Sequence, residues 1–330
     1  MITQDIKKEP QRFSVTPEHI SPEVYASIAR IGLVLIIFFA VSLTNPNFFS
    51  WFNVLSILRQ SSFLFVLASG ATLVLIAGGI DLSVGATVSL SAAVCAMVLQ
   101  STGSTVLGIG SAIAVGLAVG IVNGLLIAIL RLRPFLVTYG MLWVVSGTGL
   151  WLMAGTPITG FPAAFRSVGS GFILGVPVTI IVMIAIILIG SPALRSTTFG
   201  TQLYMMGSNK TAATLSGVPV VRNLLISYIL SGVGAAAAAI ILLGRVNSAD
   251  PGMGDSYLLP CMAAILIGGT SLFGGVGTLL GTALGAIILT TVLAAMNMLL
   301  IPSQWQPLVT GVALIFAVLV DALMKQLRQQ

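Results

Sequence analysis

Uncharged, apolar stretches of about 20 residues recur along the whole of this 330-residue chain, and they constrain its fold more than any other feature. A helix of about that length crosses a hydrocarbon core of roughly 30 Å. Runs such as 31–41 and 180–189 are apolar on every side, without the alternation of a membrane β-barrel. The chain is 57% hydrophobic and only 7% charged, so we predict an all-α membrane protein, a polytopic helical bundle.

The apolar runs predict about ten transmembrane helices, some of them broken at glycine-rich segments. The predicted spans are 25–44, 62–78, 84–101, 105–130, 135–154, 172–190, 220–243, 258–273, 278–299 and 305–324. They leave an N-terminal tail (1–24), a membrane domain (25–324) with a polar segment at 197–219, and a C-terminal tail (325–330). The first tail lacks the apolar core and cleavage site of a secretory signal.

The basic residues predict the orientation. Cytoplasmic loops carry an excess of Lys and Arg, so the net charge of +6 indicates topology rather than nucleic-acid binding. With both termini in the cytoplasm, that side receives Lys7, Lys8, Arg12, Arg30, Arg131, Arg133, Arg195, Lys210, Arg222, Lys325 and Arg328, and the outside receives only Arg59, Arg166 and Arg245. The longer outer loops are then 155–171 and 244–257, and we expect 51–60 to form a separate amphipathic helix at the outer interface.

A polar break at 78–85, Gly-Gly-Ile-Asp-Leu-Ser-Val-Gly, separates two apolar runs. Its carboxylate, Asp81, is the only acid between Glu23 and Asp250. An ionisable residue at membrane depth normally faces a packed interior or a watery cavity, and it marks a functional region. Two interpretations are open: Asp81 caps the broken helix by accepting hydrogen bonds from the amides of Ser83 or Val84, or it contacts the transported solute.

Small residues indicate close helix packing and a faint internal repeat. Gly116, Gly120 and Gly124, and again Gly277, Gly281 and Gly285, have the four-residue spacing that places them on one helix face. The segment 77–82 is similar to 267–272, and transporters are often built from repeats with broken helices at corresponding places. Two glycine pairs also arise by chance in a glycine-rich chain, so the repeat stays open.

The polar segment at 197–219 is predicted to hold a short helix. Ser208 or Asn209 can cap its start, Gly217 fits the left-handed position after a helix, and Pro219 blocks continuation. Such a helix between two spans is suited to docking a cytoplasmic partner, although a plain surface loop is the simpler interpretation of the residues alone.

Three motifs together resemble the permease subunits of ribose-type ABC sugar importers. They are the break at 78–85, Gly-Ser-Asn-Lys-Thr-Ala-Ala-Thr-Leu-Ser-Gly-Val at 207–218, and Gly-Gly-Thr-Ser-Leu-Phe-Gly-Gly-Val-Gly-Thr at 268–278. The resemblance covers about 35–325 in the right order. It implies a multi-pass protein of the bacterial inner membrane, fed by a periplasmic sugar-binding protein and driven by a separate cytoplasmic ABC ATPase.

The resemblance also assigns site residues and partners. Near the translocation path it places Gly79, Asp81, Leu82 and Ser83; in the ATPase-coupling segment it places Gly207, Asn209, Ala212, Ala213, Ser216 and Gly217. It implies pairing with a second copy or a paralogous permease, which leaves homodimer and heterodimer open, and it does not name the sugar. The chain departs from the family in one place, where Tyr-Leu-Leu-Pro at 257–260 replaces the common Tyr-Glu-Leu and loses an acid.

No Gly-x-x-x-x-Gly-Lys phosphate loop surrounds any of the four lysines, so we expect no catalytic residues, no metal site and no cofactor in this chain, with ATP and Mg bound by the partner ATPase. Cys95 and Cys261 lie in apolar runs as packing residues.

Four aromatic residues within the predicted spans are able to stack on a sugar ring or simply to pack: Tyr139, Trp143, Trp151 and Tyr228. The alternatives are an ion-coupled secondary transporter that uses Asp81, and a membrane scaffold or receptor that transports nothing.

Overall fold

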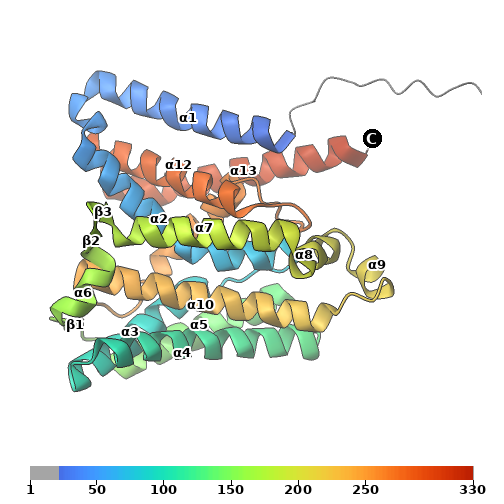
Figure 1. Ribbon diagram of the computed structural model, residues 1–330, viewed down its shortest axis with the longest axis horizontal. Helices are drawn as coiled ribbons and strands as arrows, with labels where there is room; N and C mark the ends of the chain where they lie inside the picture. Colours follow the sequence, from blue (N-terminus) through green and yellow to red (C-terminus); the bar gives the residue numbers. More distant parts are fainter. Residues whose placement is uncertain (1–21, 330) are drawn as a thin grey trace, which may run out of the picture.

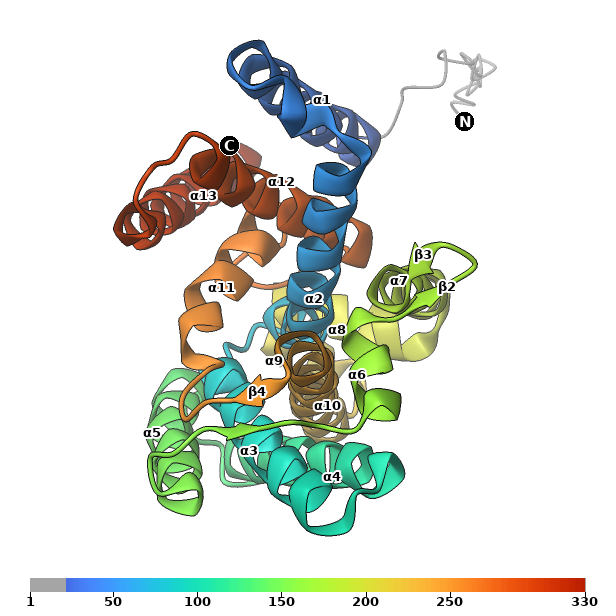
Figure 2. The same cartoon turned by 90° about the vertical axis from the view of Figure 1, so that its left-hand side faces the viewer.

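The computed structural model describes residues 22–329. The predicted N-terminal tail therefore lies outside the described residues, except for its last three positions, which begin the first helix. Figure 1 shows a bundle of helices that run mostly along the long axis of the molecule, and Figure 2 views the bundle from one end.

The α-helices are α1 (Pro22–Thr44), α2 (Trp51–Ile76), α3 (Val84–Thr102), α4 (Thr105–Gly124), α5 (Pro134–Met153), α6 (Ala163–Ser170), α7 (Val178–Ser196), α8 (Thr198–Ser208), α9 (Lys210–Leu215), α10 (Val220–Val246), α11 (Leu258–Ile267), α12 (Leu279–Met298) and α13 (Gln306–Gln329). Short helical turns are η1 (Pro46–Phe49), η2 (Leu125–Ile129), η3 (Asp255–Tyr257) and η4 (Ser303–Trp305). The strands are β1 (Ile158–Thr159), β2 (Phe172–Ile173), β3 (Val176–Pro177) and β4 (Ser248–Ala249).

The predicted helical membrane protein is confirmed. In the described chain, seven helices are long and apolar enough to cross a membrane: α2, α3, α4 with η2, α5, α7, α10 and α12. The other three predicted spans correspond to α1, to the short apolar α11 and to α13, which continues through most of the predicted C-terminal tail.

Three boundaries were predicted wrongly. Helix α11 ends at Ile267, before the end predicted for its span at 273. The segment 51–60 is not a separate interfacial helix, because α2 runs without interruption from Trp51 to Ile76. The span predicted from 172 begins instead with the antiparallel pair β2–β3, in which Ile173 faces Val176. Leu174 and Gly175 between these strands both have positive φ, which turns the chain sharply before α7 begins.

The bundle has two ends of different character. The pairs β1–β4 and β2–β3 lie with α6 at one end, on the left of Figure 1, which we call the strand end. The helices α8 and α9 and the C-terminus lie at the opposite end, which we call the α9 end. The connections and helix termini at the α9 end carry Arg131, Arg133, Arg195, Lys210 and Arg222.

Helix α10 forms the centre of one half of the bundle, between α2, α3 and α4 (Figure 2). Its approach to α4 depends on glycine, since a Cβ at Gly116 or Gly120 would collide with the α10 backbone at Gly232 or Tyr228. In the same way, Gly281 and Gly285 of α12 meet the α11 backbone. The predicted close packing is therefore present within one subunit, although Gly277 precedes α12 rather than lying on it.

Candidate functional site

The first helix break begins where α2 ends at Ala77. Gly78 has φ +80, its amide donates to Leu75 O (2.9 Å), and the amide of Gly79 donates to Val74 O (2.9 Å). This pair of bonds is the Schellman motif, in which a left-handed glycine satisfies the last carbonyl groups of a helix. The chain then runs to Val84, where α3 begins, so the predicted break is a real interruption of the helix.

Asp81 lies inside this break and is almost wholly buried, with 2% of its surface exposed. Its Oδ1 accepts hydrogen bonds from the amide of Ser83 (3.0 Å) and from Ser83 Oγ (2.6 Å), and its Oδ2 accepts one from Ser231 Oγ of α10 (2.7 Å). Asn123 of α4 donates to Ser83 Oγ (2.9 Å). The capping bond expected from Ser83 is present, and the network ties the break to two long helices.

The four predicted path residues do not line an open cavity together. Gly79 and Ser83 are buried with Asp81, and Leu82 is half-buried. A Cβ on Gly79 would collide with the hydroxyl of Tyr228, which donates to Ile80 O (3.2 Å). Because Tyr228 is fully buried, it is a packing residue and not a platform for a sugar ring. Contact between Asp81 and solute stays a prediction, since in this conformation both carboxylate oxygens face protein hydroxyl groups.

Helix α11 ends at the second break with the same Schellman motif as α2. Gly269 has φ +83 and donates to Leu266 O (2.9 Å), and the amide of Thr270 donates to Ile265 O (3.2 Å). Here too a carboxylate accepts hydrogen bonds from the residues that follow the helix end. Asp321 Oδ2 of α13 accepts from Ser271 Oγ (2.9 Å) and from the amide of Leu272 (3.1 Å). The sequence analysis did not identify Asp321, because this acid lies on a helix 50 residues away rather than in the break itself.

The two breaks meet the end of α8 in a junction made of backbone. The amide of Gly275 donates to Ile76 O (2.9 Å), which joins the second break to the last turn of α2. A Cβ on Gly207 would collide with Ile76 O and with the amide of Gly275, and one on Gly274 would lie 2.8 Å from the Cα of Gly78. We call Gly78, Gly207, Gly274 and Gly275 the glycine junction. It connects the polar segment at 197–219 directly to both interruptions in the membrane helices.

The helix predicted in this segment is α9, and its ends are formed as expected. Asn209 Oδ1 accepts from the amide of Ala212 (2.9 Å) at its start. At its end, Gly217 has φ +80 and donates to Thr214 O (3.1 Å), while the amide of Val218 donates to Ala213 O (3.0 Å), which is a third use of the Schellman motif. Helix α8, which precedes α9, was not predicted.

The predicted coupling residues fall into two groups. Asn209, Ala212, Ser216 and Gly217 are exposed on α9 or at its ends. Ala213 is the buried residue of α9, and Gly207 belongs to the glycine junction. Leu215, which the sequence did not single out, is the last residue of α9 and is 85% exposed. Tyr204 Oη of α8 donates to Gly277 O before α12 (2.7 Å), and Gln202 of α8 accepts from Asn223 of α10 (2.8 Å). Helix α8, which leads into α9, is therefore hydrogen-bonded to α10 and to the second break.

Comparison with known proteins decides the family. The family described as "Branched-chain amino acid transport system / permease component" matches residues 53–318. This chain belongs to that permease family. The matched range contains both breaks, the glycine junction, α8 and α9.

Individual relatives match over nearly their whole length. The chain is 40% identical to the ribose import permease protein RbsC of Bacillus subtilis over 293 residues, which are 88% of this chain and 91% of that one. It is 37% identical to RbsC of Escherichia coli K12 (87% and 91% covered) and 35% identical to the galactose/methyl galactoside import permease protein MglC of E. coli K12 (91% and 95% covered). No solved structure matches this chain.

Proposed function

We propose that this permease is the membrane-spanning subunit of an ABC importer for a sugar, fed by a periplasmic binding protein and powered by a separate ATPase. One observation carries the proposal: similarity over almost the full length to permeases named for ribose and for galactose import. The family description names branched-chain amino acids, but it covers the broad family, whereas the individual relatives are sugar permeases.

The structure supports a separate ATPase that contacts this permease on the cytoplasmic side. The α9 end holds the excess of basic residues and becomes the cytoplasmic side by the positive-inside rule, which puts the strand end outside. The ATPase would then contact α9, with Leu215 as the apolar residue presented to it. The glycine junction supplies a path by which movement of α8 and α9 reaches both helix breaks.

The rival interpretation, a secondary transporter that protonates Asp81, has less support. A proton-coupled carboxylate has to meet a path for protons and solute, whereas Asp81 is sealed by Ser83 and Ser231. Family membership also favours a transport system of several components, because the family is described as a permease component.

Reconstituted uptake tests the proposed function. The permease, its cognate ATPase and its binding protein are placed in proteoliposomes, and uptake of radiolabelled ribose, galactose, xylose and arabinose is measured. We expect uptake of at least one sugar that requires all three proteins and internal ATP. Uptake by the permease alone, driven by a proton or sodium gradient, would refute the proposal.

Substitution of Gly217 tests the coupling role of α9. We expect Gly217→Val to lower sugar-stimulated ATP hydrolysis by about tenfold while insertion is retained, because a β-branched residue resists positive φ at a cost of roughly 1–2 kcal/mol and redirects the chain after α9. Gly217→Asn is the matched control, since Asn tolerates the left-handed conformation. If both variants hydrolyse ATP like the wild type, α9 is an ordinary surface helix.

A further inference from the structure

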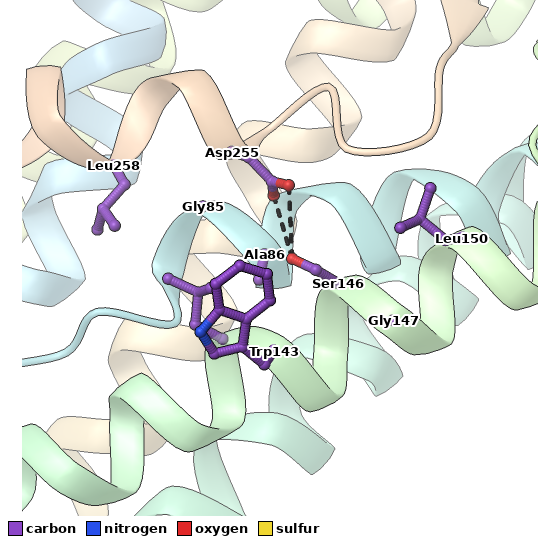
Figure 3. A pocket seen from close by; sticks show the side chains of 9 residues that line it. Gly85, Ala86, Trp143, Ser146, Gly147, Leu150, Asp255 and Leu258 are labelled. Carbon is purple, nitrogen blue, oxygen red and sulfur yellow. Dashed lines mark hydrogen bonds between the residues drawn. The ribbon is translucent and has the colours of Figure 1, made fainter.

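A pocket of about 320 Å³ lies between α3, α5 and the start of α11, away from the sealed Asp81 network. Figure 3 shows its main side chains: Trp143 and Ser146 from α5, Asp255 from η3 and Leu258 from the start of α11. Its volume is at the lower end of the range for small-molecule sites. The pocket is mostly apolar with a few polar groups at one side, which is typical of such sites.

Hydrogen bonds hold the carboxylate of Asp255 in place, and one of its oxygens can still accept a hydrogen bond from a ligand. Its Oδ1 accepts a hydrogen bond from Ser89 Oγ of α3 (3.0 Å), and Ser89 itself accepts from the amide of Gly254 (2.9 Å). Ser146 Oγ lies farther away, 3.4 Å from Oδ1 and 3.5 Å from Oδ2 (Figure 3). Within the described chain Oδ2 has only this long contact with Ser146, and Asp255 is exposed, so this oxygen remains able to accept from a ligand hydroxyl.

The pocket lies at membrane depth. Ser89 is 13 residues before the strand end of α3 at Thr102, which corresponds to roughly 20 Å along the helix. Ser146 is seven residues before the strand end of α5 at Met153, or roughly 10 Å. Asp255, which contacts both serines, therefore lies well below the end of the bundle, although it belongs to a loop predicted to be outside.

An exposed carboxylate at this depth restricts what the pocket can face. A charged side chain in contact with hydrocarbon is expensive, so such residues face a bundle interior or a water-filled cavity. The pocket wall on α5 is itself exposed, with Trp143 63% accessible. The exposed carboxylate of Asp255 on this face of α3, α5 and α11 favours water over lipid there.

We propose that this pocket contacts the transported sugar, with Trp143 as the platform for the apolar face of the ring and Asp255 as the acceptor for its hydroxyl groups. The inference rests on the proposed function, because it names the site in the pathway where the sugar is met. A sugar presents hydroxyl donors together with an apolar C–H face, and an exposed indole beside a fixed carboxylate matches both. The pocket holds an acid even though position 258, where the resembling permeases often carry one, is leucine.

Cysteine labelling tests whether the pocket borders water, without reference to any sugar. In a variant with Cys95→Ala and Cys261→Ala, we would introduce Gly147→Cys, a pocket position where a Cβ meets no atom within 4 Å. The control is Ile184→Cys on α7, which is exposed and equally far from the strand end. We expect a charged, membrane-impermeant methanethiosulfonate to modify the first and spare the second. Equal modification of both, or none of Gly147→Cys, overturns the inference.

Uptake then tests the sugar contact. We expect Trp143→Ala to lower uptake of the sugar that the wild type carries by about tenfold, Trp143→Phe to restore most of it, and Trp151→Ala, an exposed tryptophan of α5 outside the pocket, to behave like the wild type. Asp255→Asn should lower uptake in the same assay while the protein inserts normally.

The sugar contact at the pocket and the proposed function can fail separately. If the wild type carries a sugar and Trp143→Ala transports it as well as Trp151→Ala does, the pocket is not the contact site and the proposed function stands. If the wild type carries none of the four sugars, the sugar assignment is overturned for the protein and for the pocket alike.

Discussion

Replacing Gly207 by alanine is expected to lower coupled uptake at least about tenfold. The added methyl group would have to enter between Ile76 O and the amide of Gly275, the two groups whose hydrogen bond joins the first break to the second. Overpacking of this kind costs roughly 1–3 kcal/mol when neighbours can shift, and here the neighbours are backbone atoms, so we expect uptake to fall by at least about tenfold.

Substitution of a second glycine of the junction distinguishes loss of coupling from local misfolding of α8. Gly274→Ala alters a different chain segment, yet its Cβ would press on the same backbone at Gly78 and Gly207, so we expect the same loss of uptake. Gly140→Ala on α5, where a Cβ meets nothing within 4 Å, is the control. Uptake and membrane abundance are measured in parallel. Wild-type uptake by either junction variant would mean that the breaks move independently of α8.

The second large effect is expected at Asp81. Asp81→Ala removes the acceptor for three donors, the Ser83 amide and the hydroxyls of Ser83 and Ser231, in a place that water does not reach. Each buried donor left without a partner costs roughly 1–3 kcal/mol, so we expect little folded protein in the membrane. The measurement is the fraction of monodisperse protein after extraction in a mild detergent.

Asp81→Asn separates the charge from the hydrogen bonds. The amide oxygen can still accept from Ser83, and the amide nitrogen can donate to Ser231 after its hydroxyl rotates, so we expect insertion near the wild-type level. Transport should fall more than abundance does. Normal abundance together with normal transport would show that the negative charge of Asp81 is dispensable, and a loss of abundance equal to that of Asp81→Ala would show that the amide cannot replace the carboxylate.

The parts of the site that sequence predicted are local ones. The hydrogen bond by which Asp81 caps the Ser83 amide spans two residues, and the ends of α9 at Asn209 and Gly217 obey rules that apply within one turn. For the same reason, the apolar runs located most spans to within a few residues. The segment 51–60 was separated from α2 because its polar face matches an interfacial helix, and pattern alone does not show where such a helix joins the next span.

The parts that sequence did not predict depend on distant contacts. Ser231 is 150 residues from Asp81, and Asp321 is 50 residues from Ser271, so no local pattern connects them. Asp255 was assigned to an outer loop by the positions of the apolar runs, and only its contact with Ser89 of α3 reveals its depth. Whether Gly79, Leu82 and Ala212 act in transport remains a prediction from resemblance.

The glycine junction has a genetic consequence. Ordinary packing contacts can be repaired, because a larger side chain on one helix is compensated by a smaller one opposite. At Gly207 the opposing atoms are a carbonyl oxygen and an amide that every residue carries, so no exchange of side chains at Ile76 or Gly275 can make room. A search for second-site revertants of Gly207→Ala should therefore recover true revertants and changes in the partner ATPase, but no compensating substitution at the contact itself.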